Sequence, residues 1–332
     1  MYRAPEERDA CPACGSSRLE DLDLLPLRRP RQGRYIGFVE LCGECGLVFS
    51  NPLPSAEDLE HFYSPGGEWR AAAAAAVEPA ATEPRGLSWS KPFDAIRGEL
   101  RVTKPPAGAK VLDFGCGSGK LLDAFQDFGW ETAGIEPAGD DAFRRHRRLE
   151  AVPDEPTFDL IVANHVLEHV ADPLGLLRRF AAACRMSGFV FISVPRFDTL
   201  PLHRDYTYVI NGRAHITAYT WSCLQGLLRR AGFEPVAEPP ARVAKGRGKT
   251  TTSRLRVIAR RVDAGRSIAG RSIGTAPADD ARTAMRRYQA ELPERPFLER
   301  HGLYRLAARR ADTRRRRAAL VRKSAKITRA VS

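Results

Sequence analysis

Four cysteines near the N-terminus have the types and spacing of a metal site. Cys11-Pro-Ala-Cys14-Gly and Cys42-Gly-Glu-Cys45-Gly repeat one pattern, with 27 residues between Cys14 and Cys42. Four thiolates suit tetrahedral Zn²⁺, and a site whose four positions are all filled by protein is structural. The gap is longer than the ~15–20 residues of many such pairs, but it has room for a β-hairpin. The pattern predicts a structural zinc site, with reduced free thiols as the alternative.

A glycine-rich run after a short apolar strand forms a second candidate site. The expected strand Lys110–Phe114 is followed at once by Gly115, Gly117 and Gly119. Glycines allow a tight turn and let the backbone touch a ligand. The helix expected from Lys120 offers free N–H groups to an anionic group. A nicotinamide dinucleotide would fit the same loop, so the glycines alone leave the cofactor open.

Two carboxylates narrow the choice of ligand. Asp113 precedes the first glycine, where it can accept hydrogen bonds from an ammonium group, which a pyrophosphate lacks. The glycines follow the spacing G-x-G-x-G instead of the G-x-G-x-x-G of dinucleotide sites. Glu136 ends the next expected strand, Glu131–Glu136, at the place where a carboxylate binds ribose hydroxyls, a role that dinucleotide sites share. Asp113 and the glycine spacing are the two features that favour S-adenosylmethionine (SAM).

The segment Phe158–Pro173, with the sequence FDLIVANHVLEHVADP, corroborates this interpretation. It resembles the class I SAM-dependent methyltransferases, and the resemblance covers Lys91–Arg261. It implies a Rossmann-like α/β fold with a mostly parallel seven-stranded sheet and helices on both faces. A Rossmann-like domain that binds another ligand is the alternative. Motif and resemblance together give the expected cofactor-binding residues Asp113, Gly115, Gly117, Gly119, Glu136 and, nearest the sulfonium, Asn164.

The residues around the second cysteine pair carry a further resemblance. The run Cys45–Pro54, CGLVFSNPLP, followed by Phe62 and Tyr63, is similar to the zinc-ribbon extension of a subset of these methyltransferases. Members of that subset commonly act on sugars or other small molecules. The resemblance implies a small-molecule or sugar/glycan acceptor, with O-methylation favoured and nitrogen and carbon acceptors also open.

Histidines are the candidates for activating such an acceptor, because a hydroxyl needs a base near neutral pH. His169 lies in the LEHV segment, and a structural hydrogen bond is its alternative role. His215 lies in HITAYT, which resembles the run before the next helix in this branch. It is the first candidate for the base, with a solvated loop histidine as the alternative. The long connection around it predicts a substrate cap that also includes His203, Arg204, Asp205, Tyr206 and Tyr208.

The elements that must position these residues alternate between short apolar runs and helical patterns, which predicts βαβ units. Strands are expected at Lys110–Phe114, Glu131–Glu136, Phe158–Ala163 and Phe189–Val194, and helices at Lys120–Phe128, Pro173–Cys184 and Trp221–Ala231. A short third strand is expected near Leu149–Val152, with Asp154 and Glu155 as candidates for contacting adenine. Phe233–Ala237 and Arg254–Arg260 predict an antiparallel hairpin at the sheet edge.

Composition divides the chain into four parts: a zinc-ribbon module (1–54), an Ala/Pro-rich connector (55–90), the SAM domain (91–262) and an Arg-rich helical tail (263–332). From Arg242 onward there are 26 Lys and Arg against 7 Asp and Glu. The residues before Arg242 therefore carry a charge of −6 within a net charge of +13. The basic character belongs to the C-terminal part alone.

This charge distribution bears on two rival functions. An RNA methyltransferase could use the basic tail for phosphate contacts, but the acidic body and the lack of an aromatic-basic platform favour a small-molecule acceptor. A scaffold that has kept the fold without the chemistry is a third class. Nucleic-acid binding through the tail stays open, and the oligomeric state is not indicated by the sequence.

Targeting signals and long apolar stretches are missing from the sequence. The N-terminus has no apolar run of a secretory signal, and no stretch approaches the ~18–20 apolar residues of a membrane span. Seven cysteines, an odd number, argue against a fully paired disulfide framework. A cytoplasmic location is therefore expected.

Overall fold

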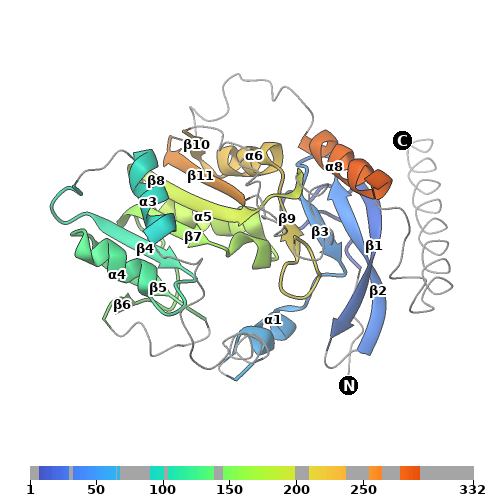
Figure 1. The fold of residues 1–332 in the computed structure, drawn as a ribbon, viewed down its shortest axis with the longest axis horizontal. Helices are drawn as coiled ribbons and strands as arrows, with labels where there is room; N and C mark the ends of the chain where they lie inside the picture. The colour runs from blue at the N-terminus through green and yellow to red at the C-terminus, as the bar shows by residue number, and fades with distance from the viewer. Residues whose placement is uncertain are drawn as a thin grey trace, which may run out of the picture.

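The computed structural model contains two β-sheets that share one continuous body (Figure 1). It describes residues 7–29, 33–64, 66–67, 90–100, 104–137, 145–198, 209–236, 254–263 and 277–291. Within these ranges, no helix is long and apolar enough to cross a membrane. The expected cap residues 203–208, most of the Ala/Pro-rich connector (65 and 68–89) and most of the Arg-rich tail (264–276 and 292–332) lie outside the described residues.

The larger sheet has seven strands in the order β10-β11-β8-β7-β4-β5-β6. Five neighbouring strands of this sheet, β8, β7, β4, β5 and β6, run parallel to one another. This arrangement confirms the predicted fold class. The strands are β4 (Lys110–Phe114), β5 (Glu131–Ile135), β6 (Arg147–Arg148), β7 (Phe158–Asn164), β8 (Cys184–Pro195), β10 (Phe233–Pro235) and β11 (Arg254–Arg261).

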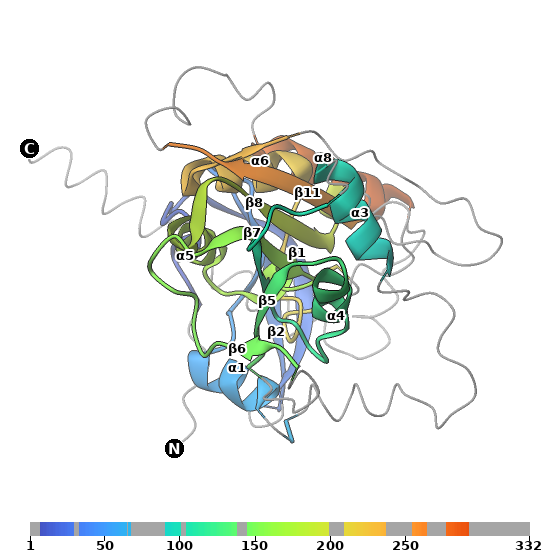
Figure 2. The ribbon, with the colours of Figure 1, turned by 90° about the vertical axis from the view of Figure 1, so that its left-hand side faces the viewer.

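Helices cover both faces of this sheet because successive residues of each buried strand point to opposite faces. Val111 of β4 lies in a buried cluster with Phe125, whereas its neighbour Leu112 lies in another cluster with Phe180. Figure 2 shows α3 and α4 on one side of the sheet and α5 and α6 on the other. The four helices are α3 (Ser90–Leu100), α4 (Lys120–Asp127), α5 (Pro173–Ala183) and α6 (Trp221–Ala231).

Both edges of the sheet are close to the sequence-based expectation. β10 pairs antiparallel with β11, and β11 pairs antiparallel with β8, so the edge hairpin is confirmed. The short strand expected near Leu149–Val152 lies two residues earlier, at Arg147–Arg148. The N–H of Leu149 donates to the carbonyl oxygen of Gly134 at 2.9 Å and closes the ladder there. The apolar residues that suggested the later position follow the strand instead of forming it.

The N-terminal residues form a second, four-stranded sheet in the order β1-β2-β3-β9. β9 is contributed by the segment that follows β8, and it pairs antiparallel with β3 through Val48↔Ala218 and Phe49↔Thr217. The N-terminal sheet is therefore joined directly to the larger body. Its strands are β1 (Leu19–Arg29), β2 (Gly33–Cys42), β3 (Val48–Asn51) and β9 (Thr217–Ala218), and helix α1 (Ala56–Tyr63) follows β3.

Helix α8 (Pro277–Glu291) closes the described chain and packs on this second sheet. Ala278 and Met285 lie in one buried cluster with Val39 and Leu41 of β2. In Figure 1, α8 lies beside the strands of the N-terminal sheet and next to α6. This helix falls within the Arg-rich tail that the sequence predicts to be helical, and its apolar face is part of the core.

Candidate functional site

The loop between β4 and α4 is built on glycines in a conformation that other residues rarely adopt. Gly115, Gly117 and Gly119 have φ angles of +75°, +53° and +76°. A Cβ atom on Gly115 would lie 2.6 Å from Cγ2 of Val166, so at this position only hydrogen fits. The glycine loop therefore packs directly against the loop that follows β7.

Glu136 lies just beyond β5 and contacts this loop. The backbone N–H of Gly117 donates a hydrogen bond of 2.8 Å to Oε2 of Glu136. Gly115 N–H also donates to the carbonyl oxygen of Ile135 at 2.8 Å, which ties the loop to the end of β5. The arrangement brings the acid and the glycine backbone together, as a ribose-binding carboxylate beside a ligand-binding loop requires.

Asp113 lies beneath the same loop and is 3% exposed. Burial, with a smaller contribution from the negative charge of Glu136, raises the pKa of Asp113 to about 7. Such a carboxyl group is ionised at little cost only when a positive charge lies nearby. A ligand that carries an ammonium or sulfonium group would supply that charge.

The loop lies at the point where the strand order of the sheet reverses. From β4 the chain continues through β5 and β6 on one side, and then through β7 and β8 on the other. Open α/β sheets bind ligands at the carboxyl ends of the strands at such a point. Asn164, the last residue of β7, ends beside β4 at this edge.

A second group of polar side chains lies just beyond Asn164. His169 ends a short 3₁₀ helix, Leu167–His169, and its ring lies 4.9 Å from the ring of His215 at an interplanar angle of 79°. Nδ1 of His169 donates to the carbonyl oxygen of Ala214 at 2.9 Å. The hydroxyl oxygen of Tyr63, from α1, lies 2.8 Å from the same nitrogen. Two histidines that are 46 positions apart in the sequence are thus in contact.

Glu168 supplies a buried carboxylate to this group. It is 1% exposed, and its Oε1 accepts a hydrogen bond of 3.0 Å from Nδ1 of His165. Among the described residues, its Oε2 is buried without a hydrogen-bond partner. Burial acts to raise the pKa of Glu168, but the hydrogen bond from His165 and the nearby His169 hold it below its usual value.

Backbone hydrogen bonds fix the two loops relative to each other. The N–H of Ile216 donates to the carbonyl oxygen of Glu168, and the carbonyl oxygen of Ile216 accepts from the N–H of Ser50 in β3, both at 2.9 Å. Oδ1 of Asn211 accepts from the backbone N–H of His215 at 3.2 Å. The N-terminal sheet therefore helps to position His215.

The environment of His169 limits what this residue can do. Burial is the main reason why the pKa of His169 is lowered to about 4. A general base works best with a pKa near the working pH, so His169 is a weak proton acceptor at neutral pH. A neutral imidazole with one nitrogen held by a carbonyl is suited to orienting a group or to binding a metal.

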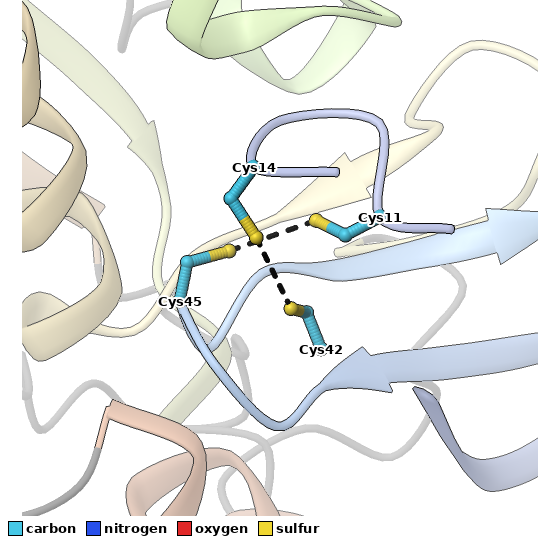
Figure 3. Close-up of side chains that lie close together, drawn as sticks. All are labelled: Cys11, Cys14, Cys42 and Cys45. Carbon is cyan, nitrogen blue, oxygen red and sulfur yellow. Dashed lines mark hydrogen bonds between the residues drawn. The ribbon is translucent and has the colours of Figure 1, made fainter. Parts of the chain in front are cut away.

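The four N-terminal cysteines converge on one point (Figure 3). Sγ of Cys11 lies 3.6 Å from Sγ of Cys45, and Sγ of Cys14 lies 3.5 Å from Sγ of Cys42. A tetrahedral ion with Zn–S bonds of about 2.3 Å requires S···S distances of about 3.8 Å. The quartet therefore fits a structural zinc ion.

Both halves of the quartet use the same turn. Gly15 N–H donates to the carbonyl oxygen of Cys11 at 2.9 Å, and Gly46 N–H donates to that of Cys42 at 3.0 Å. Both glycines have positive φ angles, of 72° and 74°. The quartet also packs against α6, because Cys223 lies in the same buried cluster as Cys11 and Cys42. The cluster thus belongs to the core that supports the larger sheet.

Sequence reasoning missed two residues of the site, Tyr63 and Glu168. Burial and the negative charges of Glu168 and Glu136 raise the pKa of Tyr63 above its usual value, so this side chain faces both acids. The Phe62-Tyr63 pair and the acid within LEHV were the available signals. The sequence did not indicate that Tyr63 of α1 contacts His169.

Comparison with known proteins agrees with this fold. Residues 90–238 match the family model described as a methyltransferase domain. The ubiquinone biosynthesis O-methyltransferase of Ruegeria pomeroyi is 29% identical, over 42% of this chain and 65% of that protein. That of Xanthomonas campestris pv. campestris is 34% identical, over 28% of this chain and 45% of that protein. The chain thus spans less than two thirds of the length of these relatives.

One solved structure is also similar to part of the chain. The 1,6-didemethyltoxoflavin-N1-methyltransferase of Burkholderia thailandensis is 22% identical, with a TM-score of 0.42, over 54% of this chain and 80% of that chain. The segment that matches the family model, residues 90–238, contains the glycine loop, Glu136, Asn164 and both site histidines. These residues are therefore similar to the methyltransferase domain family.

Proposed function

We propose that this protein transfers a methyl group from SAM to a small-molecule or sugar/glycan acceptor, with a hydroxyl as the favoured acceptor. The observation that carries the proposal is the contact between Gly117 and Glu136 above the buried Asp113. Glu136 can bind a ribose diol there, and Asp113 can bind an ammonium group, which a pyrophosphate lacks. The relatives from Ruegeria pomeroyi and Xanthomonas campestris are named as O-methyltransferases, which supports the choice of oxygen.

Each cofactor residue has a proposed role. Glu136 accepts hydrogen bonds from the ribose hydroxyls. Asp113, in its ionised form, binds the ammonium group of SAM. Gly115, Gly117 and Gly119 let the backbone approach the ligand. Asn164 borders the place of the sulfonium, which supplies an activated methyl group and a good leaving group.

The acceptor is proposed to bind next to His169 and His215. Methyl transfer is an in-line displacement, so the protein mainly has to hold the acceptor oxygen near the methyl carbon. The contact of Gly115 with Val166 brings the loop that carries Glu168 and His169 next to the cofactor loop. His215 and Glu168 are then the side chains available to activate the acceptor hydroxyl.

The proposal is tested by measuring the release of S-adenosylhomocysteine (SAH) with four acceptor panels: ortho-diphenols, nucleotide sugars, glycans and RNA. Activity with one of the first three panels that is lost in Glu136→Gln supports the proposal. Turnover with RNA alone would overturn the choice of acceptor class. Asp127→Asn, an exposed residue at the end of α4, is the matched control and should keep full activity.

Two further roles accompany this function. The cysteine quartet is proposed to hold a structural Zn²⁺, because its sulfur atoms have tetrahedral spacing. A cytoplasmic location is proposed with it, since a reducing compartment keeps thiols available for metal. An RNA substrate is the second candidate, and the observation that favours it is the excess of Lys and Arg after Arg242.

A further inference from the structure

Glu168, His169 and His215, which border the proposed acceptor, also lie close enough together to hold one metal ion. Each of the three offers one ligand atom, and these atoms all lie within 4.8 Å of one another. We propose that this cluster binds a divalent first-row transition-metal ion, which chelates two neighbouring oxygen atoms of the acceptor. The inference deepens the proposed function and rests on it for the role of the metal, although not for the existence of the site.

The spacing of the two imidazoles agrees with a shared ion. With metal–nitrogen bonds of about 2.1 Å and an angle near 100°, two histidine ligands place their ring centroids about 5 Å apart. The centroids of His169 and His215 are 4.9 Å apart. Two histidines and one carboxylate with open positions are a known donor set for divalent iron and similar ions.

The carboxylate of Glu168 provides independent support. Its Oε2 is buried and, within the described part of the chain, makes no hydrogen bond. A buried carboxylate oxygen without a partner is costly, and pairing or metal coordination removes that cost. The other oxygen accepts a hydrogen bond from His165, as the second oxygen of a metal-binding carboxylate commonly does.

The surroundings of the histidines are those of metal ligands. A ligating histidine usually donates its other ring N–H to a carbonyl or carboxylate, and Nδ1 of His169 donates to the carbonyl of Ala214. His215 sits on a loop that Asn211 holds by side-chain hydrogen bonds to three successive backbone N–H groups. The loop is thus preorganised, which reduces the entropy lost on binding an ion.

The chemistry follows from the open positions of such an ion. An acceptor with two neighbouring oxygens, such as an ortho-diphenol or a vicinal diol, would chelate it, and a bound hydroxyl loses its proton to water more easily. The resulting oxyanion attacks the methyl carbon. The new O–CH₃ bond forms as the S–CH₃ bond of SAM breaks, and SAH leaves as a neutral thioether. Acceptors with a single hydroxyl lack the chelating geometry.

The test uses Mn²⁺ as the probe, because Mn²⁺ prefers oxygen and nitrogen donors over the thiolates of the quartet. Electron paramagnetic resonance of Mn²⁺ titrated into the zinc-loaded full chain should show one bound ion per chain. Glu168→Gln and His215→Gln should each weaken that binding at least tenfold. His61→Gln, an exposed histidine on α1, should bind as the unchanged protein does.

The outcome separates the site from the proposed function. No Mn²⁺ binding by the unchanged, SAM-binding protein would overturn the metal site. Equal binding in Glu168→Gln and His215→Gln, with their zinc content and SAM affinity retained, would overturn it too. A third result is that the unchanged protein binds Mn²⁺ but no SAM, and that both variants lose the Mn²⁺. This result would support the metal site and overturn the methyltransferase proposal.

Discussion

Asp113 is the residue whose charge depends most directly on the ligand. In the ligand-free protein, burial raises the pKa of Asp113 to about 7, and a cationic ligand favours its ionised form. SAM affinity is therefore expected to fall as the pH is lowered through about 7, by up to tenfold per pH unit. Calorimetric titration with SAM between about pH 5.5 and 8.5 measures this slope.

Asp113→Asn provides the comparison for that measurement. This variant should bind SAM more weakly above pH 7, and its SAM affinity should not depend on the ionisation of residue 113. If the SAM affinity of Asp113→Asn depended on pH as that of the unchanged protein does, Asp113 would not be the residue that binds the ammonium group.

The raised pKa of Asp113 also affects stability: the folded protein keeps a proton that the unfolded chain loses from about pH 4 upward. The contribution is fully present below the unfolded pKa and is lost as the pH rises through about 7.

Glycine is required at Gly115 and Gly117 for different reasons: backbone conformation at both, and close packing at Gly115 alone. Both have positive φ angles, but only at Gly115 would a Cβ collide with Val166. Gly117→Ala is expected to cost about 1–2 kcal/mol in free energy of unfolding through backbone strain. Gly115→Ala should cost more and also displace the loop after β7. Chemical denaturation of both variants checks the order, and equal losses would argue against the packing contact.

At the level of elements, the pairing of β3 with β9 links the cysteine quartet to the candidate site around His215. Removal of zinc should loosen β3, and with it the hydrogen bond from Ser50 to Ile216 that holds the His215 loop. Methyl transfer is therefore expected to fall at least tenfold in Cys14→Ser, with a lower Tm. SAM affinity should fall less, because the glycine loop belongs to β4. Zinc content, Tm and activity are the measurements.

A matched control for the zinc prediction is Cys184→Ala, which alters a buried cysteine outside the quartet. It should lose stability through a small cavity but keep its zinc. Full activity of a zinc-free protein would show that the N-terminal sheet does not position the site. Loss of SAM binding in parallel with activity would show that zinc supports the whole body instead of one loop.

The parallel strands β4, β5, β7 and β8 could be predicted from sequence because each contains a short apolar run, and the cysteine quartet because its spacing is specific. β6 could not be placed in this way, because it consists of Arg147 and Arg148. The site could be predicted only in part. Tyr63 reaches His169 because α1 folds back after β3, and β9 is a two-residue strand without a pattern of its own. Contacts between distant loops depend on tertiary packing, which no local pattern encodes.

For the whole molecule, α8 shows that the first part of the basic tail belongs to the folded core. Its apolar face covers β2, and Asp280 accepts a hydrogen bond of 2.6 Å from Ser222 of α6. Removing residues 264–332 should therefore destabilise the protein, whereas removing 292–332 leaves this packing in place. The shorter deletion removes thirteen Lys and Arg and three acidic residues.

The deletion of 292–332 distinguishes the two acceptor classes. We expect it to keep small-molecule methyl transfer within about twofold, because the removed residues lie outside the described site. Any RNA binding should weaken, together with its dependence on salt, since phosphate contacts by Lys and Arg release counterions. RNA-binding titrations at two salt concentrations and SAH release check both parts. Loss of turnover with every small acceptor would instead support the RNA substrate.

In the proposed function, Asp113, the glycine loop and Glu136 together bind SAM. Calorimetric titration of SAM into the unchanged chain and into Glu136→Gln tests it most directly, with Asp127→Asn as control. A hydrogen bond to a charged group contributes about 1.5–3 kcal/mol, so the variant should bind SAM about 10- to 100-fold more weakly. The control should match the unchanged chain at one SAM per chain. Equal affinity in Glu136→Gln, or no SAM binding by the unchanged chain, would contradict the claim.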